Sequence, residues 1–96
     1  LRDGISSMDG RTLKIIIKGS RNYLRWTIEQ WFYEVKDIVE NEYGVKLLIE
    51  VIDGDEEYPL IMYGDKVFFE GLPGEEGYLI EVLKRIVEEA LKLIYE

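Results

Sequence analysis

The sequence predicts a two-layer α/β fold, in which a four-stranded sheet packs against two helices in the order β-α-β-β-β-α. Three observations support it: alternating apolar positions in residues 12–18 and 45–52, a hairpin pattern in residues 58–71, and two amphipathic segments. The 96 residues, with 47% hydrophobic and 33% charged side chains, have the composition of a single globular domain. We expect residues 12–96 to form that domain. Residues 1–11, where Met8 looks like a natural start, are expected to be an N-terminal extension outside the core.

The first strand and the first helix follow from two different apolar periods. Thr12–Lys18 has apolar residues at every second position, which is typical of a strand. Gly19–Tyr23 is rich in turn-forming residues and predicts a loop. In Leu24–Tyr43 the apolar residues recur at spacings of three and four, so they share one helical face. Asn22 is a candidate N-cap, and Gly44 stands where a helix end often needs a left-handed residue.

The remaining strands are predicted from alternation and from a turn. Val45–Ile52 alternates again, and a helical crossover from the first strand makes the two strands parallel and right-handed. An acidic loop, Asp53–Glu57, leads into a hairpin. Its strands, Leu60–Tyr63 and Lys66–Glu70, flank the two-residue turn Gly64-Asp65.

The last element is a second amphipathic helix. Glu75 and Glu76 put negative charge where a helix N-terminus is positive, and the apolar face is continuous from Tyr78 onward. The outer face is expected to carry two ion pairs in the favourable i, i+4 order, Glu81–Arg85 and Glu88–Lys92.

The chain contains no Cys and no His, and this excludes several classes of chemistry. Disulfide exchange, thiolate nucleophiles, thiolate or imidazole metal sites and imidazole acid–base catalysis all need these side chains. We therefore expect no metal and no cofactor.

No apolar run approaches the roughly 20 residues of a membrane span, and no apolar signal segment is present, so we expect a cytoplasmic protein. The bias toward Glu and Lys indicates a thermophilic source.

The net charge of −8 is unevenly distributed. Residues 1–25 hold six Lys/Arg and two Asp, a net charge of +4, whereas residues 26–96 hold six Lys/Arg and eighteen acids, a net charge of −12. Overall acidity argues against a nucleic-acid partner, because neutralising phosphates drives that binding.

The order of elements, the proline that opens the third strand and the Gly71-Leu72-Pro73 stretch before the last helix together resemble the thioredoxin-like superfamily. The resemblance covers nearly the whole chain from Leu13. It implies a mixed sheet in the strand order 2-1-3-4 with two helices on one face. In that family the strand-opening proline, here Pro59, is characteristically cis and faces an active-site loop, here Ser20–Arg25.

The chain departs from thioredoxins in having no helix between the second and third strands, and this shorter order is more similar to the selenoprotein-W-type branch. There a Cys-x-x-Cys or Cys-x-x-Sec is often followed by Arg-Trp, which Arg25 and Trp26 match. Without a thiol or selenol the redox activity is not carried over. The family's active-site loop and proline correspond to Arg21, Asn22, Tyr23, Leu24 and Pro59, with Arg21 and Leu24 at the two redox positions.

The loop before the first helix is a candidate anion-binding site. Its cations and a hydroxyl converge where free N–H groups and the helix dipole favour an anion such as a phosphate, a carboxylate or an acidic peptide. The alternative is a set of ordinary exposed cations. An enzyme hypothesis uses Tyr23 or Ser20 to activate a bound thiol, as glutathione transferases do. The candidate anion-binding residues are Lys18, Ser20, Arg21 and Arg25.

The acidic loop has two interpretations. Its clustered carboxylates are the ligands that a hard cation prefers, but a solvated turn is favoured because the register of an EF-hand is missing. The carboxylates are Asp53, Asp55, Glu56 and Glu57.

The missing helix predicts that one face of the sheet is open. A face that mixes apolar residues with paired charges usually marks an interaction surface, so we expect a homodimer or a protein partner there or at an edge strand. The alternative is a monomer whose Lys stems cover the apolar surface. Either Ile61 and Tyr63 or Leu60 and Met62, together with Phe68 or its neighbours, extend this face. The interface candidates are Lys14, Ile16, Leu48, Glu50, Ile52 and Phe68.

Two aromatic residues of the first helix, Trp26 and Tyr33, lie off its apolar stripe. They either face a partner or pack at the margin of the core.

Overall fold

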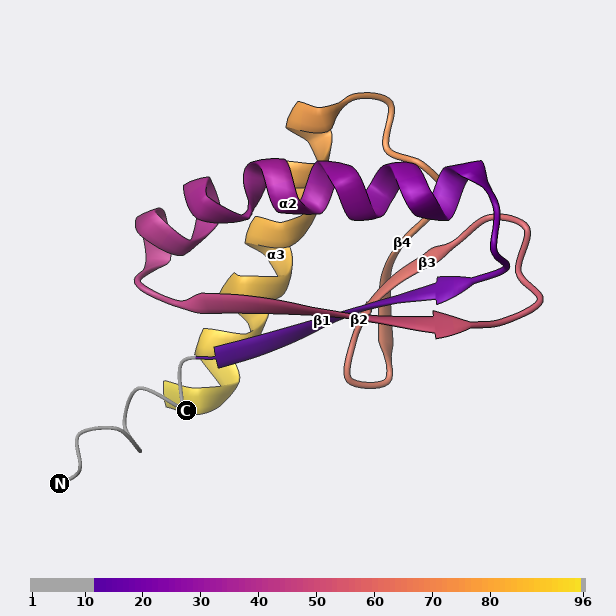
Figure 1. The fold of residues 1–96 in the computed structure, drawn as a ribbon. Helices are drawn as coiled ribbons and strands as arrows, with labels where there is room; N and C mark the ends of the chain where they lie inside the picture. Colours follow the sequence, from indigo (N-terminus) through magenta and orange to yellow (C-terminus); the bar gives the residue numbers. More distant parts are fainter. Residues whose placement is uncertain (1–11, 96) are drawn as a thin grey trace, which may run out of the picture.

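The computed structural model describes residues 12–95, with side chains through Lys92, and the expected extension of residues 1–11 lies outside this part. The order of elements is the predicted one (Figure 1). The elements are β1 (Thr12–Gly19), α2 (Tyr23–Tyr43), β2 (Lys46–Asp53), β3 (Leu60–Tyr63), β4 (Lys66–Glu70) and α3 (Glu76–Tyr95).

The strands form one mixed sheet in the order β2-β1-β3-β4, as expected. β1 and β2 are parallel, while β3 pairs antiparallel with both β1 and β4. α2 lies along β1 and β2, and α3 passes beside α2 (Figure 1). Neither helix combines the length and the apolarity needed to cross a bilayer.

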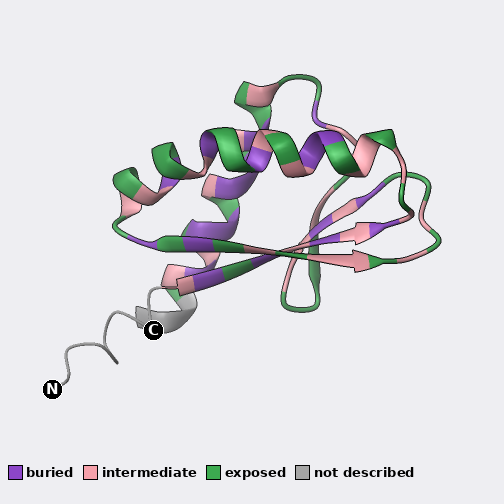
Figure 2. Ribbon diagram, in the orientation of Figure 1, coloured by how far each residue is buried: buried purple, intermediate pink, exposed green. Residues whose placement is uncertain are grey.

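The core lies between the sheet and the two helices. Figure 2 shows the buried segments of α2 and α3 alternating with exposed ones, as an amphipathic helix requires. Ile15, Ile28 and Val82 have no exposed surface, and each comes from a different element. The buried hydrophobic residues are Leu13, Ile15, Ile17, Ile28, Phe32, Val35, Val39, Val45, Leu47, Ile61, Leu79, Val82, Leu83, Ile86, Val87 and Ala90.

Both ends of α2 are capped by the predicted residues. The Asn22 side-chain oxygen accepts the backbone N–H of Arg25 at 3.0 Å, which satisfies one of the free donors of the first turn. Gly44 has φ 66° and donates its N–H to the carbonyl of Glu40. This left-handed conformation is accessible to glycine without a steric penalty, which explains where the helix ends.

The ion pairs expected along α3 are replaced by other contacts among the described side chains. The Arg85 guanidinium lies 6.0 Å from the centre of the Tyr78 ring, one and a half to two turns away on the same helix. Glu88 accepts a hydrogen bond from the Tyr43 hydroxyl, which raises the pKa of Tyr43 to about 12 and connects α3 to the end of α2. These groups have partners that the helical repeat alone does not reveal.

Glu40 connects the end of α2 to the edge strand β2. Its carboxylate accepts the backbone N–H of Leu47 at 2.7 Å and the Lys36 ammonium at 3.1 Å. Burial by itself raises the pKa of Glu40, but the hydrogen bonds from Leu47 and Lys36 outweigh it and hold the pKa below its ordinary value of 4.5. The ionised form therefore stabilises the fold.

We expect acid to weaken the fold partly through Glu40. A carboxyl group with a lowered folded pKa stabilises the protein above its unfolded pKa, and this contribution disappears as the pH falls through the folded value. Glu40→Gln should lower the free energy of unfolding by about 1–2 kcal/mol at neutral pH and by much less in acid. Urea unfolding at both pH values measures this. The exposed Glu34→Gln serves as the control, and a pH dependence unchanged by Glu40→Gln would contradict the assignment.

Candidate functional site

The loop between β1 and α2 brings the predicted cations together, but around a carboxylate of the chain itself. Asp53, at the end of β2, accepts hydrogen bonds from Arg25 at 2.7 Å and from Arg21 at 3.1 Å. Arg25 also donates to the carbonyl of Gly19 at 3.0 Å. The hydrogen bonds from Arg21 and Arg25 hold the pKa of Asp53 below its ordinary range. Two of the expected anion-binding residues are therefore already paired.

The other two candidates contact the acidic loop. The Lys18 ammonium lies 3.6 Å from a carboxylate oxygen of Glu56, and the Ser20 hydroxyl donates to the Glu56 carbonyl at 2.9 Å. Asn22 donates to the Ser20 hydroxyl and to the carbonyl of Glu57. These contacts thus hold the basic loop and the acidic loop together. The three cations Lys18, Arg21 and Arg25 are paired with Asp53 and Glu56 of the chain itself, so the two loops form a junction.

The two hydroxyls that were considered for activating a bound thiol, those of Ser20 and Tyr23, lie in different surroundings. Ser20 is engaged with Glu56 and Asn22, whereas Tyr23 is 72% exposed on the outer side of α2. At the two family redox positions, Arg21 is exposed and Leu24 is half-buried. Within residues 12–92 no group of three or more acids is placed to hold a metal ion.

Pro59 lies directly before β3 as expected, but it does not have the cis conformation that the resemblance implied. The peptide bond before Pro59 is trans, which is the lower-energy isomer. Pro59 is buried beside Gly19, and its carbonyl accepts the N–H of Gly71 at 2.7 Å. The proline serves as the beginning of a strand.

The sheet face opposite the helices matches the predicted composition, and we refer to it as the open face. Ile16 of β1 is level with Glu50 of β2 and with Met62 of β3, at the middle of the sheet. Ile61 pairs with the buried Ile17 and is itself fully buried, so the strand β3 contributes Leu60 and Met62 to the open face rather than Ile61 and Tyr63. The side chains of the open face are Lys14, Ile16, Lys18, Lys46, Leu48, Glu50, Ile52, Leu60, Met62, Val67 and Glu70.

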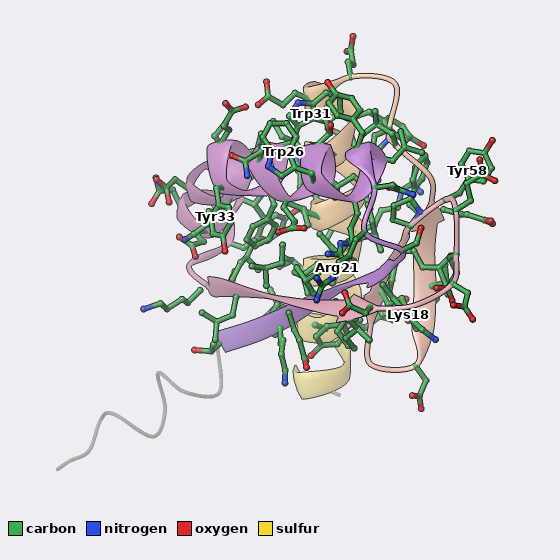
Figure 3. All side chains as sticks on the ribbon, turned by 45° about the vertical axis from the view of Figure 1, so that its right-hand side comes forward. Lys18, Arg21, Trp26, Trp31, Tyr33 and Tyr58 are labelled. Atoms are coloured by element: carbon green, nitrogen blue, oxygen red, sulfur yellow. The ribbon has the colours of Figure 1, made fainter. Side chains whose placement is uncertain are left out.

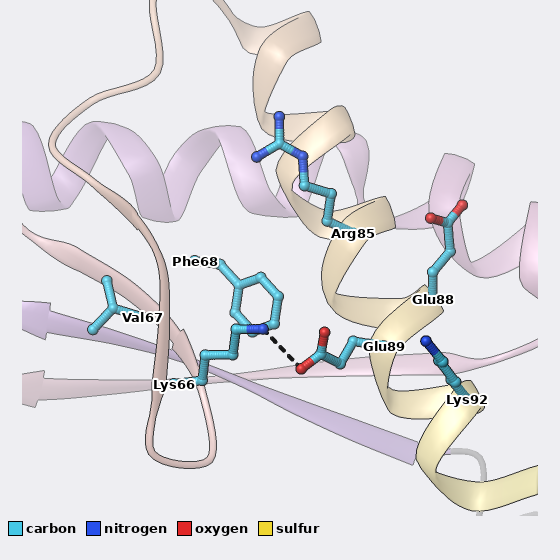
Figure 4. Close-up of a pocket in the computed structure, with 7 residues that line it drawn as sticks. All are labelled: Lys66, Val67, Phe68, Arg85, Glu88, Glu89 and Lys92. Carbon is cyan, nitrogen blue, oxygen red and sulfur yellow. Dashed lines mark hydrogen bonds and ion pairs between the residues drawn. The ribbon is translucent and has the colours of Figure 1, made fainter. Parts of the chain in front are cut away.

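Phe68 or its neighbours were expected on the open face, and the structure places the neighbour Val67 there and not Phe68. Ile61 pairs with Phe69 and Met62 with Val67, so Phe68 is an extra residue in β4. Its ring packs against the core on the side of α3 and lies 4.9 Å from the Lys66 ammonium (Figure 4). Val67, which is 46% exposed, takes its place opposite Met62.

A shallow groove between β4 and α3 has no counterpart in the sequence-based predictions. It encloses about 500 Å³, and Lys66 bridges it to Glu89 at 2.9 Å (Figure 4). Its position depends on the bulge at Phe68, which no local sequence pattern signals. The lining residues carry charges of both signs and are Lys66, Val67, Phe68, Arg85, Glu88, Glu89 and Lys92.

Two aromatic residues of α2 that were expected either to face a partner or to pack at the margin of the core are exposed. Trp26 is 54% and Tyr33 58% exposed, whereas Trp31 packs against the core (Figure 3). The rings of Tyr23 and Trp26 stack with their centres 5.9 Å apart. Trp26 and Tyr33 are therefore surface residues and not part of the core margin.

Comparison with known proteins adds no assignment: no protein-family model matches the sequence, and no relative is found among curated proteins. The surfaces of the fold must therefore support any functional conclusion.

Proposed function

We propose that the protein is a redox-inactive, thioredoxin-like binding module of the cytoplasm, which pairs with a second copy of itself through the open face. The strand order, the parallel β1–α2–β2 unit and the proline at the beginning of β3 support the thioredoxin-like assignment. The proposed function includes no redox chemistry, because the sequence has no Cys. The positions that correspond to the family's redox residues hold Arg21 and Leu24.

The observation that carries the proposal is the apolar character of the open face. Leu48 is 47% and Val67 46% exposed, at opposite edges of the sheet. Burying apolar surface contributes about 25 cal/mol per Å², so a face of this kind favours a partner. Half-buried apolar residues connect its two edges, and the complete apolar set is Ile16, Leu48, Ile52, Leu60, Met62 and Val67.

The charges around this set favour a second copy as the partner. Lys14 and Lys46 lie at the end of the open face where β1 and β2 begin, and Lys14 is 3.2 Å from Glu50. Glu70 lies at the other end, level with Leu60 and Lys18, and the exposed Asp55 and Glu57 of the acidic loop follow β2 at that end. In a two-fold symmetric pair of packed sheets whose axis runs across the strands, Lys46 of each copy lies toward the acidic end of the other.

Sedimentation velocity at tens of micromolar protein tests the proposal. We expect a species of twice the 11.3 kDa chain mass. Ile16→Lys puts a charge at the centre of the open face and should shift the protein to the monomer mass. Ile38→Lys adds the same charge at a 51% exposed apolar position of α2 and should leave the dimer intact. A parent protein of monomer mass, or a dimer unaffected by Ile16→Lys, would reject the open face as the interface.

A further inference from the structure

The outer side of α2 carries a row of exposed aromatic rings, which we refer to as the aromatic ridge: Tyr23, Trp26 and Tyr33. Their spacings of three and seven residues place them on one side of the helix. The three side chains are 72%, 54% and 58% exposed, and Figure 3 places Trp26 and Tyr33 along the helix. The stacked pair Tyr23 and Trp26 makes a continuous surface at the beginning of α2.

The fold does not account for the ridge. The buried residues of α2 lie on its other side, where Ile28, Phe32 and Val39 are at most 1% exposed. Tyr33 contacts the ring of Phe32 edge-on, yet most of its surface faces solvent. Tryptophan and tyrosine are the residues that most often dominate binding energy at protein interfaces. A row of them on a helix surface therefore points to a partner.

The charge around the ridge indicates the chemistry of that partner. α2 contains five acids and two bases. Its two bases are already paired, since Arg25 lies 2.7 Å from Asp53, and Lys36 lies 3.1 Å from Glu40 and 3.7 Å from Asp37. Exposed Glu34 and Asp37 follow the ridge toward the end of the helix, which is also the negative end of its dipole. The surface combines exposed π faces with net negative charge.

We propose that the aromatic ridge binds a cationic peptide segment of another protein. Lys or Arg side chains of the partner lie over the faces of Trp26 and Tyr33, where a cation is attracted by the ring. Their charged heads pair with the exposed carboxylate of Glu34, while their apolar stems cover the rings. Single-stranded nucleic acid also stacks on aromatic rows, but it needs a basic groove, and this surface has the same sign of charge as phosphate.

The proposed contact is independent of the open face, because α2 covers the opposite side of the sheet. Its partner also differs. With a net charge of −8, a second copy of this chain is a poor source of unpaired cations, whereas a basic segment of a different protein supplies them.

Calorimetric titration with a short amphipathic peptide of Lys, Arg and Leu tests the proposal, with the same peptide carrying Glu in place of Lys and Arg as the second probe. We expect saturable binding of the cationic peptide at low salt and none of the acidic one. The double variant Trp26→Ala/Tyr33→Ala should weaken binding about tenfold, since each cation–π contact contributes roughly 0.5–1 kcal/mol. Circular dichroism verifies that the double variant is folded.

The matched control is Ile38→Ala, which removes a 51% exposed apolar side chain from a different side of α2 and should bind the peptide as the parent does. Ile16→Lys should also retain peptide binding, whether or not it changes the sedimentation mass, so the two proposals fail separately. Three results would overturn the inference: no saturable binding of the cationic peptide, equal binding by the double variant, or binding of an oligothymidine probe that depends on the ridge.

Discussion

Replacing Phe32 by alanine should remove a large part of the stability of the protein, with a decrease of about 3–5 kcal/mol in the free energy of unfolding. Phe32 is 1% exposed and is among the largest fully buried side chains, on the face of α2 that packs into the core. Truncation loses the transfer free energy of the ring and leaves a cavity. Because small domains are stable by only about 5–15 kcal/mol, the variant should unfold at much lower urea concentrations. Circular dichroism across a urea titration measures the change.

The neighbouring Tyr33 supplies the matched control. It is an aromatic residue of the same helix, but it is 58% exposed. Tyr33→Ala loses little buried surface and the edge-on contact with Phe32, so the expected decrease is about 0.5–1.5 kcal/mol. Equal losses in the two variants would show that α2 presents a different face to the sheet.

Much of the fold was predictable, because most of its elements have a clear apolar period and explicit ends. The alternation in β1 correctly assigned Leu13, Ile15 and Ile17 to the buried face. Asn22 and Gly44 marked the ends of α2 through backbone chemistry that is local in sequence. α3 begins at Glu76, where the acidic pair Glu75-Glu76 indicated a helix N-terminus.

The face of β4 could not be predicted, because a strand pattern determines faces only while the pairing register is regular. One extra residue at Phe68 moves its side chain from the open face to the side of α3. Similarly, Leu60 and Met62 could be separated from Ile61 and Tyr63 only by the pairing of Ile61 with Ile17.

The pairing of the two charged loops had a signal that the sequence-based prediction did not use. β1 and β2 are parallel, so their carboxyl ends meet at one edge of the sheet, and Gly19 is level with Asp53 there. This register brings the basic loop after β1 beside the acidic loop after β2. Treated separately, the first loop was a candidate anion site, and the second was interpreted as a solvated turn with a cation site as the alternative. Together they form the ion pairs of Asp53 with Arg21 and Arg25.

Among the proposed variants, Gly19→Val should have the largest effect on stability after Phe32→Ala, with a decrease of about 1–3 kcal/mol in the free energy of unfolding. A side chain on Gly19 would place its Cβ 3.0 Å from the Cα of Pro59 and 3.4 Å from the carbonyl oxygen of Glu56. Both neighbours are backbone atoms, and the Glu56 carbonyl also accepts the N–H of Ser20 at 2.9 Å. They cannot move aside without disturbing the beginning of β3 and the junction of the two loops.

Gly74→Ala is the control for Gly19→Val, because no atom lies within 4 Å of the Cβ that it adds, and its stability should match the parent's. Urea unfolding of both variants measures the difference, and a fully stable Gly19→Val would show that β1 and Pro59 are not in close contact.

The contact between Gly19 and Pro59 is also relevant to function. In the thioredoxin-like family the strand-opening proline faces the active-site loop, but here the residue before that loop packs directly on Pro59. The two surfaces proposed for partners, the open face and the aromatic ridge, lie away from this closed junction.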